Sequence, residues 1–367
     1  MTGQKIAFYA PLKSPDHPVP SGDRQMARML IYGLRQAGYQ VELASQCRAF
    51  LNDSLDSNAL SELERRANLE IKRLTENWKA QGPPSLWFCY HPYYKSPDLI
   101  GPALCEKFDM PVITAEASYS VRRNHGIWIA TQEKVLATIN RAVVNICFTQ
   151  RDEAGLRAVS KQANLISLKP FIDTSEYIKY HKKTRTVRFV TVAMMRAGDK
   201  MLSYKHLARS LKKLLHLQWT LSIVGDGELR SEVHRLFDGE LKDRVKWHGK
   251  MPREAIAELF SHSTLYLWPG CGEAYGLAYL EAQSAGLPVV AFRTAGVADV
   301  VYDKTTGLLT PAGDENAYAS AIADLLSDSE EIARLSANAR SQAQSEHSLE
   351  SASNCLDGLL KPYVEGG

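Results

Sequence analysis

Two glutamates stand eight positions apart in a segment that carries glycines on both sides. The run reads Glu273-Ala-Tyr-Gly-Leu-Ala-Tyr-Leu-Glu281, with the loop Pro269–Gly272 before it and Gly286 after it. This pattern predicts a loop, a helix, a glycine stop and then a buried strand. A loop that feeds a helix start offers free backbone N–H groups and the positive end of the helix dipole, which suit a diphosphate. Because the two carboxylates could accept hydrogen bonds from sugar hydroxyls, the segment predicts a nucleotide-sugar site.

The elements that must position this segment alternate between short apolar runs and helical patterns, which is typical of parallel sheets covered on both faces. We expect strands over 5–10, 39–44, 85–90, 111–114, 143–148 and 165–168, and again over 187–193, 219–224, 245–247, 264–268 and 287–292. Helices are expected over 59–80, 202–215, 228–237, 252–261, 276–285, 314–326 and 328–342. The fold class is therefore α/β, with two Rossmann-like domains. Ligands of such sheets bind beyond the carboxyl ends of the strands.

Composition narrows the function classes. The 367 residues suit two domains of ordinary size, and 45% hydrophobic with 23% charged residues is typical of a soluble globular protein. A net charge of +3 is too small to imply nucleic acid, which we do not expect as a partner. The six cysteines are scattered without CxxC pairs, which favours free thiols. With no leader-like apolar run and no membrane span, we expect a cytoplasmic protein.

The C-terminal half resembles the retaining glycosyltransferases of family 4, which have the two-domain GT-B fold. Besides the glutamate pair, the resemblance rests on three segments in the expected order: Ile223–Arg230, Trp247–Gly249 and Tyr302–Asp314. It implies an acceptor-binding domain over 1–180 and a donor-binding domain over 181–345, facing a cleft. It also implies that residues 346–367 form a helix that packs back on the N-terminal domain.

The resemblance assigns roles to the donor side. Glu273 would contact the sugar, Glu281 the ribose, and the backbone of Ala274, Tyr275, Gly276 and Leu277 the diphosphate. Gly22, Gly225 and Gly249 match glycines of the family that lie near the donor. The family also places an arginine and a lysine on the diphosphate. Arg196 and Lys205 are the matches we select, and Lys200 competes with Lys205.

The acceptor side departs from the family. The position where the family often carries a histidine corresponds to Ala117. Glu116, Ser118, His91 and His125 are alternatives among which the sequence does not choose, and Arg122 follows them in the same stretch. The basic helix Lys205–His216 is either a solvated face or a contact with anionic lipid.

The function implied is a hexosyl transfer that retains configuration, from a nucleotide diphosphate sugar to a glycan or lipid-linked acceptor. Cell-envelope polysaccharide synthesis at the inner membrane face is the context expected by analogy. The absence of an Asp-x-Asp motif favours a site without metal or cofactor, in which Arg and Lys neutralise the diphosphate. A nucleotide-sugar 2-epimerase on the same scaffold and a non-catalytic nucleotide-sugar-binding protein are the alternatives.

Overall fold

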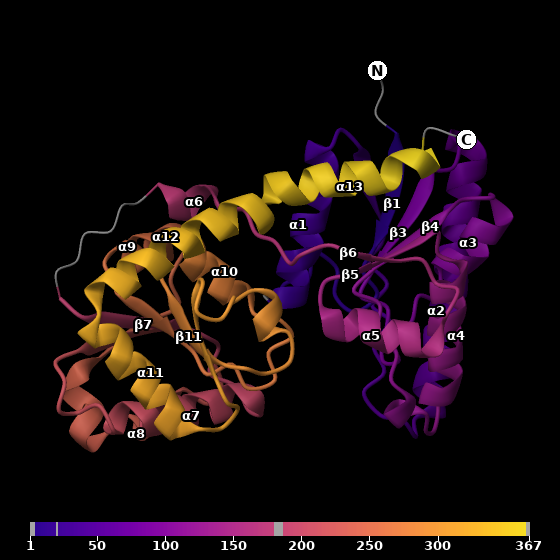
Figure 1. Cartoon of the computed structure of the whole chain (residues 1–367). Helices are drawn as coiled ribbons and strands as arrows, with labels where there is room; N and C mark the ends of the chain where they lie inside the picture. The colour runs from indigo at the N-terminus through magenta and orange to yellow at the C-terminus, as the bar shows by residue number, and fades with distance from the viewer. Residues whose placement is uncertain (1–3, 20, 180–185, 365–367) are drawn as a thin grey trace. The chain divides into compact units, whose positions relative to one another are not determined.

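The chain forms two compact α/β units. The computed structural model describes residues 4–19, 21–179 and 186–364. The N-terminal unit comprises Met1–Lys169 with Leu349–Gly367, and the C-terminal unit comprises Pro170–Ser348 (Figure 1). The sequence placed the boundary between residues 180 and 181, which lie outside the described residues. The division falls earlier because the segment after Lys169 packs in the C-terminal unit, where the Arg253 guanidinium donates to the Asp173 carbonyl.

The N-terminal unit alternates strands and helices along its whole length. Its elements are β1 Lys5–Tyr9, α1 Gly22–Gln36, β2 Gln40–Ser45, α2 Ser57–Gln81, β3 Leu86–Tyr90, α3 Gly101–Lys107, β4 Val112–Ala115, the short 3₁₀ helix Val121–Arg123, α4 Trp128–Arg141, β5 Val144–Cys147, α5 Gln150–Val159, β6 Leu165–Ser167 and, from the chain end, α13 Leu349–Val364. All pairs in its sheet are parallel, and the order is β2-β1-β3-β4-β5-β6.

The C-terminal unit repeats this architecture. Its elements are α6 Ser175–Ile178, β7 Arg188–Val192, α7 Asp199–Lys212, β8 Thr220–Val224, α8 Arg230–Leu236, the 3₁₀ helix Gly239–Arg244, β9 Val245–Gly249, α9 Arg253–Ser261, β10 Leu265–Leu267, α10 Leu277–Ser284, β11 Val289–Phe292, the 3₁₀ helix Val297–Asp299, β12 Gly307–Thr310, α11 Glu315–Ser327 and α12 Ser329–Glu346. Its parallel sheet has the order β12-β11-β10-β7-β8-β9, which is the Rossmann order.

Burial explains why these runs become strands. Every residue of β3 is buried, as are all four residues of β4, β5 and β11, because helices cover both faces of each sheet. In α1 the side chain of Ser21 caps the helix by accepting from the Arg24 N–H, and Met26, Leu30 and Leu34 are buried. The six cysteines are all unpaired.

Helix α13 belongs to the N-terminal unit although it follows the C-terminal unit in sequence. It lies beside α1, and the two helices are joined by a hydrogen bond from the Ser353 hydroxyl to the Gly33 carbonyl at 3.0 Å (Figure 1). The Tyr39 hydroxyl also donates to Asp357 at 3.0 Å.

Apart from small shifts at element ends, the start of α7 and strand β12 differ from the sequence predictions. Helix α7 begins at Asp199 rather than at residue 202, because Gly198 at its N-cap offers no side-chain signal for the start. Strand β12 lies within Tyr302–Asp314, which the sequence treated only as a closing turn and helix cap. Its register pairs Val289–Phe292 with Gly307–Thr310, so the sheet gains a sixth strand.

Candidate active site

The strongest candidate site lies where the strand order of the C-terminal sheet reverses. In that order the switch falls between β7 and β10, which pair with each other. Lys200 follows the carboxyl end of β7, and Glu273 follows the carboxyl end of β10. Ligands of open α/β sheets bind at this kind of position. Two residues 73 positions apart in sequence therefore meet where a ligand is expected.

Only one of the two oxygens of the Glu273 carboxylate is bonded within the described residues. Its Oε1 atom pairs with the Lys200 ammonium and accepts a hydrogen bond from the Trp268 indole at 3.0 Å. The ammonium also lies 5.5 Å from the Trp268 ring centre. The side chains of Lys200 and Glu273 are 18% and 16% exposed. Among the described residues no group bonds to Oε2 of Glu273, so this oxygen can accept from a ligand hydroxyl.

The lysine that pairs with Glu273 is Lys200 rather than the selected Lys205. Lys205 lies five positions further along α7 and is exposed, and no described carboxylate pairs with it. Arg196 is also exposed, but it lies on the same β7–α7 loop region that leads to Lys200. No ion pair within the described part of the chain engages Arg196, so its guanidinium is available to an anion.

The start of α10 has the geometry expected of an anion-binding loop. Gly276 forms the N-cap with φ of 80°, a left-handed conformation that other residues rarely adopt. A Cβ atom there would also lie 2.6 Å from the Tyr279 ring, so the glycine has a structural reason besides ligand approach. Ala274 before it is exposed, whereas Tyr275 and Leu277 are buried.

Glu281 lies inside α10 and contacts residues that the sequence did not single out. The Tyr177 hydroxyl hydrogen-bonds Glu281, and the Arg253 guanidinium donates to the same hydroxyl at 3.2 Å. Burial and the charge of Glu281 raise the pKa of Tyr177 above its usual value, so Tyr177 stays protonated and donates. Tyr177 and Arg253 were missed because α6 and α9 approach α10 only in the fold.

The three other glycines predicted at the donor site, Gly22, Gly225 and Gly249, differ in whether packing within the chain requires a glycine there. Gly225 is fixed by close packing, since a Cβ atom would lie 1.9 Å from the Ala193 carbonyl oxygen. Gly249 has φ of 63° with open space around it. Gly22 begins α1 next to the cluster described below, and a Cβ there would meet nothing within 4 Å. Packing therefore explains Gly225, while nothing in the chain demands glycine at Gly22.

A second polar cluster lies at the switch point of the N-terminal sheet, between β1 and β3. Asp23, in the first turn of α1, pairs with the ring nitrogen Nδ1 of His91 at 3.1 Å. Glu116 follows the neighbouring strand β4 and accepts from the Tyr90 hydroxyl at 2.8 Å. His91 and Glu116 have φ of 59° and 56°, a region in which side chains other than glycine are strained. Such strain is concentrated at functional sites.

The charges of this cluster are coupled. Burial raises the pKa of Glu116 to about 7, although the charge of His91 and the Tyr90 hydrogen bond both oppose the rise. Burial alone would lower the pKa of His91, but Glu116 and the hydrogen bond with Asp23 raise it to about 9. Near pH 7 the imidazolium is therefore paired with Asp23 beside a carboxyl that can gain or lose a proton.

The remaining acceptor-side candidates do not enter the cluster. Ala117 is buried in an apolar group with Val135 and Ile139, so Glu116 rather than residue 117 carries the polar side chain at this strand end. Ser118 is half-buried, and its N–H donates to the Pro92 carbonyl. Arg122 is exposed on the 3₁₀ helix that follows.

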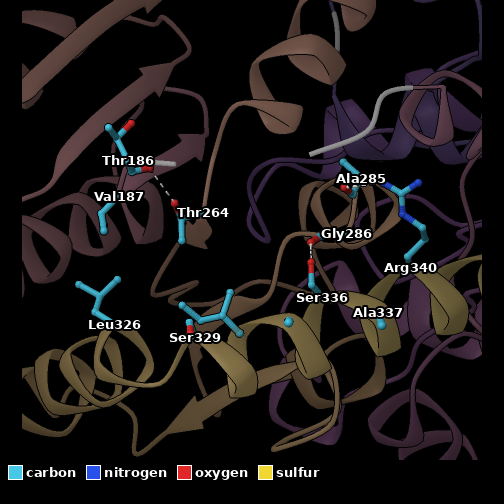
Figure 2. A pocket seen from close by; sticks show the side chains of 12 residues that line it. Thr186, Val187, Thr264, Ala285, Gly286, Leu326, Ser329, Ser336, Ala337 and Arg340 are labelled. Carbon is cyan, nitrogen blue, oxygen red and sulfur yellow. Dashed lines mark hydrogen bonds between the residues drawn. The ribbon is translucent and has the colours of Figure 1, made fainter. Parts of the chain in front are cut away.

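A cavity of about 520 Å³ lies at the opposite edge of the C-terminal sheet. Val187 and Thr264, which line it, precede β7 and β10, so they mark the amino ends of these strands. Figure 2 shows Arg340 and Ser336 of α12 beside Ala285 and Gly286; Arg340 donates to the Ala285 carbonyl at 3.1 Å and Ser336 bonds the Gly286 carbonyl. Because these polar groups are already bonded within the chain, the cavity is not the candidate site.

The described part of the chain offers neither a cluster of metal ligands nor a membrane-spanning helix. Within residues 4–19, 21–179 and 186–364, no group of three or more His, Cys, Asp or Glu side chains is placed to hold a metal ion. Over the same ranges, no helix combines the length and the apolar character needed to cross a bilayer. In the basic helix α7, His206 and Arg209 both pair with Glu315 of α11.

The C-terminal unit is similar in sequence to known glycosyltransferases. Residues 180–342 match the family model of glycosyl transferases group 1. The alpha-D-kanosaminyltransferase of Streptomyces kanamyceticus is 32% identical over 140 residues, which are 38% of this chain and 36% of that protein. The amylovoran biosynthesis glycosyltransferase AmsK of Erwinia amylovora is 28% identical over 147 residues, with the same two coverages. The matched part thus spans about a third of these relatives.

Solved structures share the fold over the whole chain. A sucrose-phosphate synthase from Thermosynechococcus elongatus superimposes with a TM-score of 0.77 at 20% identity, covering 99% of this chain and 100% of that one. HepE of Anabaena, solved in complex with UDP, gives 0.71 at 16% identity, covering 98% and 100%. These similarities confirm the GT-B fold class expected from the sequence.

Proposed function

We propose that this protein is a retaining glycosyltransferase that moves a hexosyl group from a nucleotide diphosphate sugar to a glycan or lipid-linked acceptor. The observation that carries the proposal is the Glu273 carboxylate at the switch point of the C-terminal sheet. Lys200 and Trp268 bond its Oε1 atom, and Oε2 remains available to a ligand. The match of residues 180–342 to glycosyl transferases group 1 supports it, because that match includes this site.

The donor is held by residues of the C-terminal unit. Oε2 of Glu273 accepts from the sugar hydroxyls, since Oε1 is already engaged by Lys200 and Trp268. The diphosphate lies against the start of α10, where the helix dipole and unpaired N–H groups favour an anion. Glu281, positioned by Tyr177, accepts from the ribose hydroxyls. The UDP complex of the similar HepE fold makes a UDP-sugar the first donor to test.

In the transfer step, the bond between the anomeric carbon and the diphosphate oxygen breaks while the acceptor oxygen bonds to the same carbon. Negative charge grows on the leaving diphosphate, and Arg196 with Lys200 stabilises it. Preorganised cations of this kind act most strongly where charge develops in the transition state. The proton of the acceptor hydroxyl passes to the leaving diphosphate on the same face. The two cations take the place that a divalent metal would have.

The acceptor is presented by the N-terminal unit, where His91, Asp23 and Glu116 lie at the carboxyl ends of the strands. The relative AmsK is named for amylovoran biosynthesis, which favours polysaccharide synthesis as the context. Contact with an anionic membrane at the cytoplasmic face belongs to the same proposal. The 2-epimerase is not proposed, since no observation favours it.

The test begins with the purified full chain and a panel of UDP-, GDP- and ADP-sugars. A donor that binds the native state raises the unfolding temperature, and transfer is then measured against a panel of glycan and lipid-linked acceptors. We expect Glu273→Ala and Arg196→Ala to abolish transfer while the fold survives. Glu240→Ala and Lys242→Ala, at exposed positions of the same unit, are the matched controls.

Three outcomes would contradict the proposal. Full transfer by the purified Glu273→Ala or Arg196→Ala variant would remove the site from the reaction. Conversion of the donor alone into a second nucleotide sugar would indicate an epimerase. Tight donor binding without turnover across the acceptor panel would indicate a binding protein.

A further inference from the structure

Cations and aromatic rings alternate along one surface of the N-terminal unit. We call it the cation–aromatic surface. It comprises Arg48, Phe50, Tyr94, Lys95 and Arg123, together with the buried ring of Trp128 beneath them. None of these residues belongs to the candidate donor site in the C-terminal unit.

The contacts form a continuous series. The Arg48 guanidinium lies 4.6 Å from the Phe50 ring centre, and the Lys95 ammonium lies 6.0 Å from that ring and 5.3 Å from the Trp128 ring. Trp128 meets Tyr94 edge to face at 4.8 Å. The Arg123 guanidinium lies 5.6 Å from the Tyr94 ring, which completes the series. The rings therefore fix where the three positive charges lie.

The sheet topology places this surface at the edge where ligands bind. Arg48 and Phe50 follow β2, Tyr94 and Lys95 follow β3, and Arg123 follows β4. All three strands run parallel, so their carboxyl ends share one edge of the sheet. Ligands of open parallel sheets lie beyond that edge.

The three cations lack carboxylate partners. Elsewhere in the unit, Arg65 pairs with Glu62 and Arg73 pairs with Glu70. Among the described residues no Asp or Glu pairs with Arg48, Lys95 or Arg123, and Arg48 donates only to the Leu12 carbonyl at 3.1 Å. These three positive charges are therefore not neutralised by a described carboxylate.

The surface continues into the polar cluster. The Tyr93 ring stacks on His91 with centres 5.0 Å apart, and it meets Tyr94 edge to face at 5.2 Å. The Tyr93 ring thus connects the cation–aromatic surface to His91, one of the residues proposed to receive the acceptor hydroxyl. Aromatic rings with polar edges also suit the mixed apolar and hydroxyl faces of a sugar.

We propose that the cation–aromatic surface binds the acceptor through a phosphate or diphosphate attached to its sugar. The inference rests on the proposed function and specifies the class of acceptor: a glycosyl phosphate rather than a neutral glycan. Arginine forks match phosphate oxygens in pairs, and lysine adds a point charge. A nucleic acid is disfavoured because the net charge of the chain is only +3.

The phosphate can come from a free sugar phosphate or from a lipid-linked sugar. Exposed apolar side chains give the second source a physical basis. Leu55 is 82% exposed and Ile129, in the first turn of α4, is 48% exposed. The segments just before these two residues meet through a hydrogen bond from the Ile127 N–H to the Ser54 carbonyl. The experiment therefore has one arm in solution and one on vesicles.

The first arm measures binding of glucose 1-phosphate and of glucose to the full chain by ligand-observed NMR. We expect the wild type to bind glucose 1-phosphate more tightly than glucose. The triple variant Arg48→Gln, Lys95→Gln and Arg123→Gln should bind the phosphate at least about tenfold more weakly. The control removes the same charge at exposed positions of the same unit, through Lys79→Gln, Lys107→Gln and Lys161→Gln.

The second arm measures co-sedimentation with phosphatidylcholine vesicles, with and without a polyisoprenyl diphosphate sugar. Binding that requires this lipid and is lost in the triple variant identifies a lipid-linked acceptor; binding of glucose 1-phosphate alone identifies a soluble one. Equal affinity of the wild type for glucose and glucose 1-phosphate would overturn the inference. So would equal losses in the triple variant and its control.

Two further measurements separate this inference from the proposed function. A folded triple variant, with a single cooperative unfolding transition, is the first requirement. Its affinity for a nucleoside diphosphate is expected to be unchanged, because the donor residues lie in the other unit. A chain that binds no nucleotide but retains phosphate selectivity at this surface would refute only the proposed function. The single variant Arg123→Glu, at an exposed position, should weaken glucose 1-phosphate binding more than Arg123→Gln.

Discussion

Replacing Lys200 by methionine tests the candidate site directly, because sequence alone favoured Lys205. Methionine retains an apolar stem against Trp268 but removes the charge that pairs with Glu273. Lys205→Met is the matched control, since it removes the same charge from an exposed position on the same helix.

The structure sets the size of the effect on stability. Exposed ion pairs contribute about 0–1 kcal/mol, whereas breaking a fully buried pair costs about 3–5 kcal/mol. The pair here is 18% and 16% exposed, and the Trp268 N–H still donates to Glu273 after the change. We therefore expect Lys200→Met to lower the free energy of unfolding by about 1–2 kcal/mol. Lys205→Met should change it by less than about 0.5 kcal/mol.

The effect on turnover should be much larger than the effect on stability. Removing one group that stabilises developing negative charge costs about 100-fold to 1,000-fold in kcat. Release of nucleoside diphosphate from a bound donor, with saturating donor and acceptor, measures this. Lys200→Met should lose at least about 100-fold, and Lys205→Met less than about twofold. A hundredfold loss in Lys205→Met with an active Lys200→Met variant would refute the assignment.

Three further predictions concern Tyr177, His91 and the independence of transfer from a metal. Tyr177→Phe removes a buried hydroxyl from between Glu281 and Arg253, so the KM for the donor should rise several-fold with kcat little changed; an unchanged KM would separate Glu281 from donor binding. The pKa of His91 is raised to about 9 in the fold, above about 6.5 in the unfolded chain. The stabilisation that the charged His91 gives the fold is present below pH 6.5 and is lost as the pH rises through 9. The urea concentration at the unfolding midpoint should therefore fall over this pH range, and His91→Gln should make that fall less steep. An equally steep fall in both proteins would contradict the pairing of His91 with Asp23. Treatment with EDTA should leave transfer unchanged, and a loss of activity that magnesium restores would contradict the proposed use of Arg196 and Lys200 in place of a metal.

Strand positions were largely predictable because a strand buried on both faces must be a short apolar run. The five buried residues of β3 are an example, and the sequence placed that strand over 85–90. The start of α7 was not predictable in this way, since Gly198 supplies no polar cap. The pairing of Lys200 with Glu273 was not predictable either, because it joins two loops that are far apart in sequence.

The sequence by itself determined the fold class, because alternating buried strands and helices leave a local pattern. It also singled out the segment proposed to bind the donor, because the paired glutamates and the loop–helix–glycine pattern depend only on neighbours in the chain. The tertiary structure decided which side chains meet. His91, Asp23 and Glu116 come from three separate segments, and only the strand order brings them together at one edge. Tyr177 reaches Glu281 for the same reason. Such contacts arise from strand register and helix packing, which link distant segments that carry no local signal of each other.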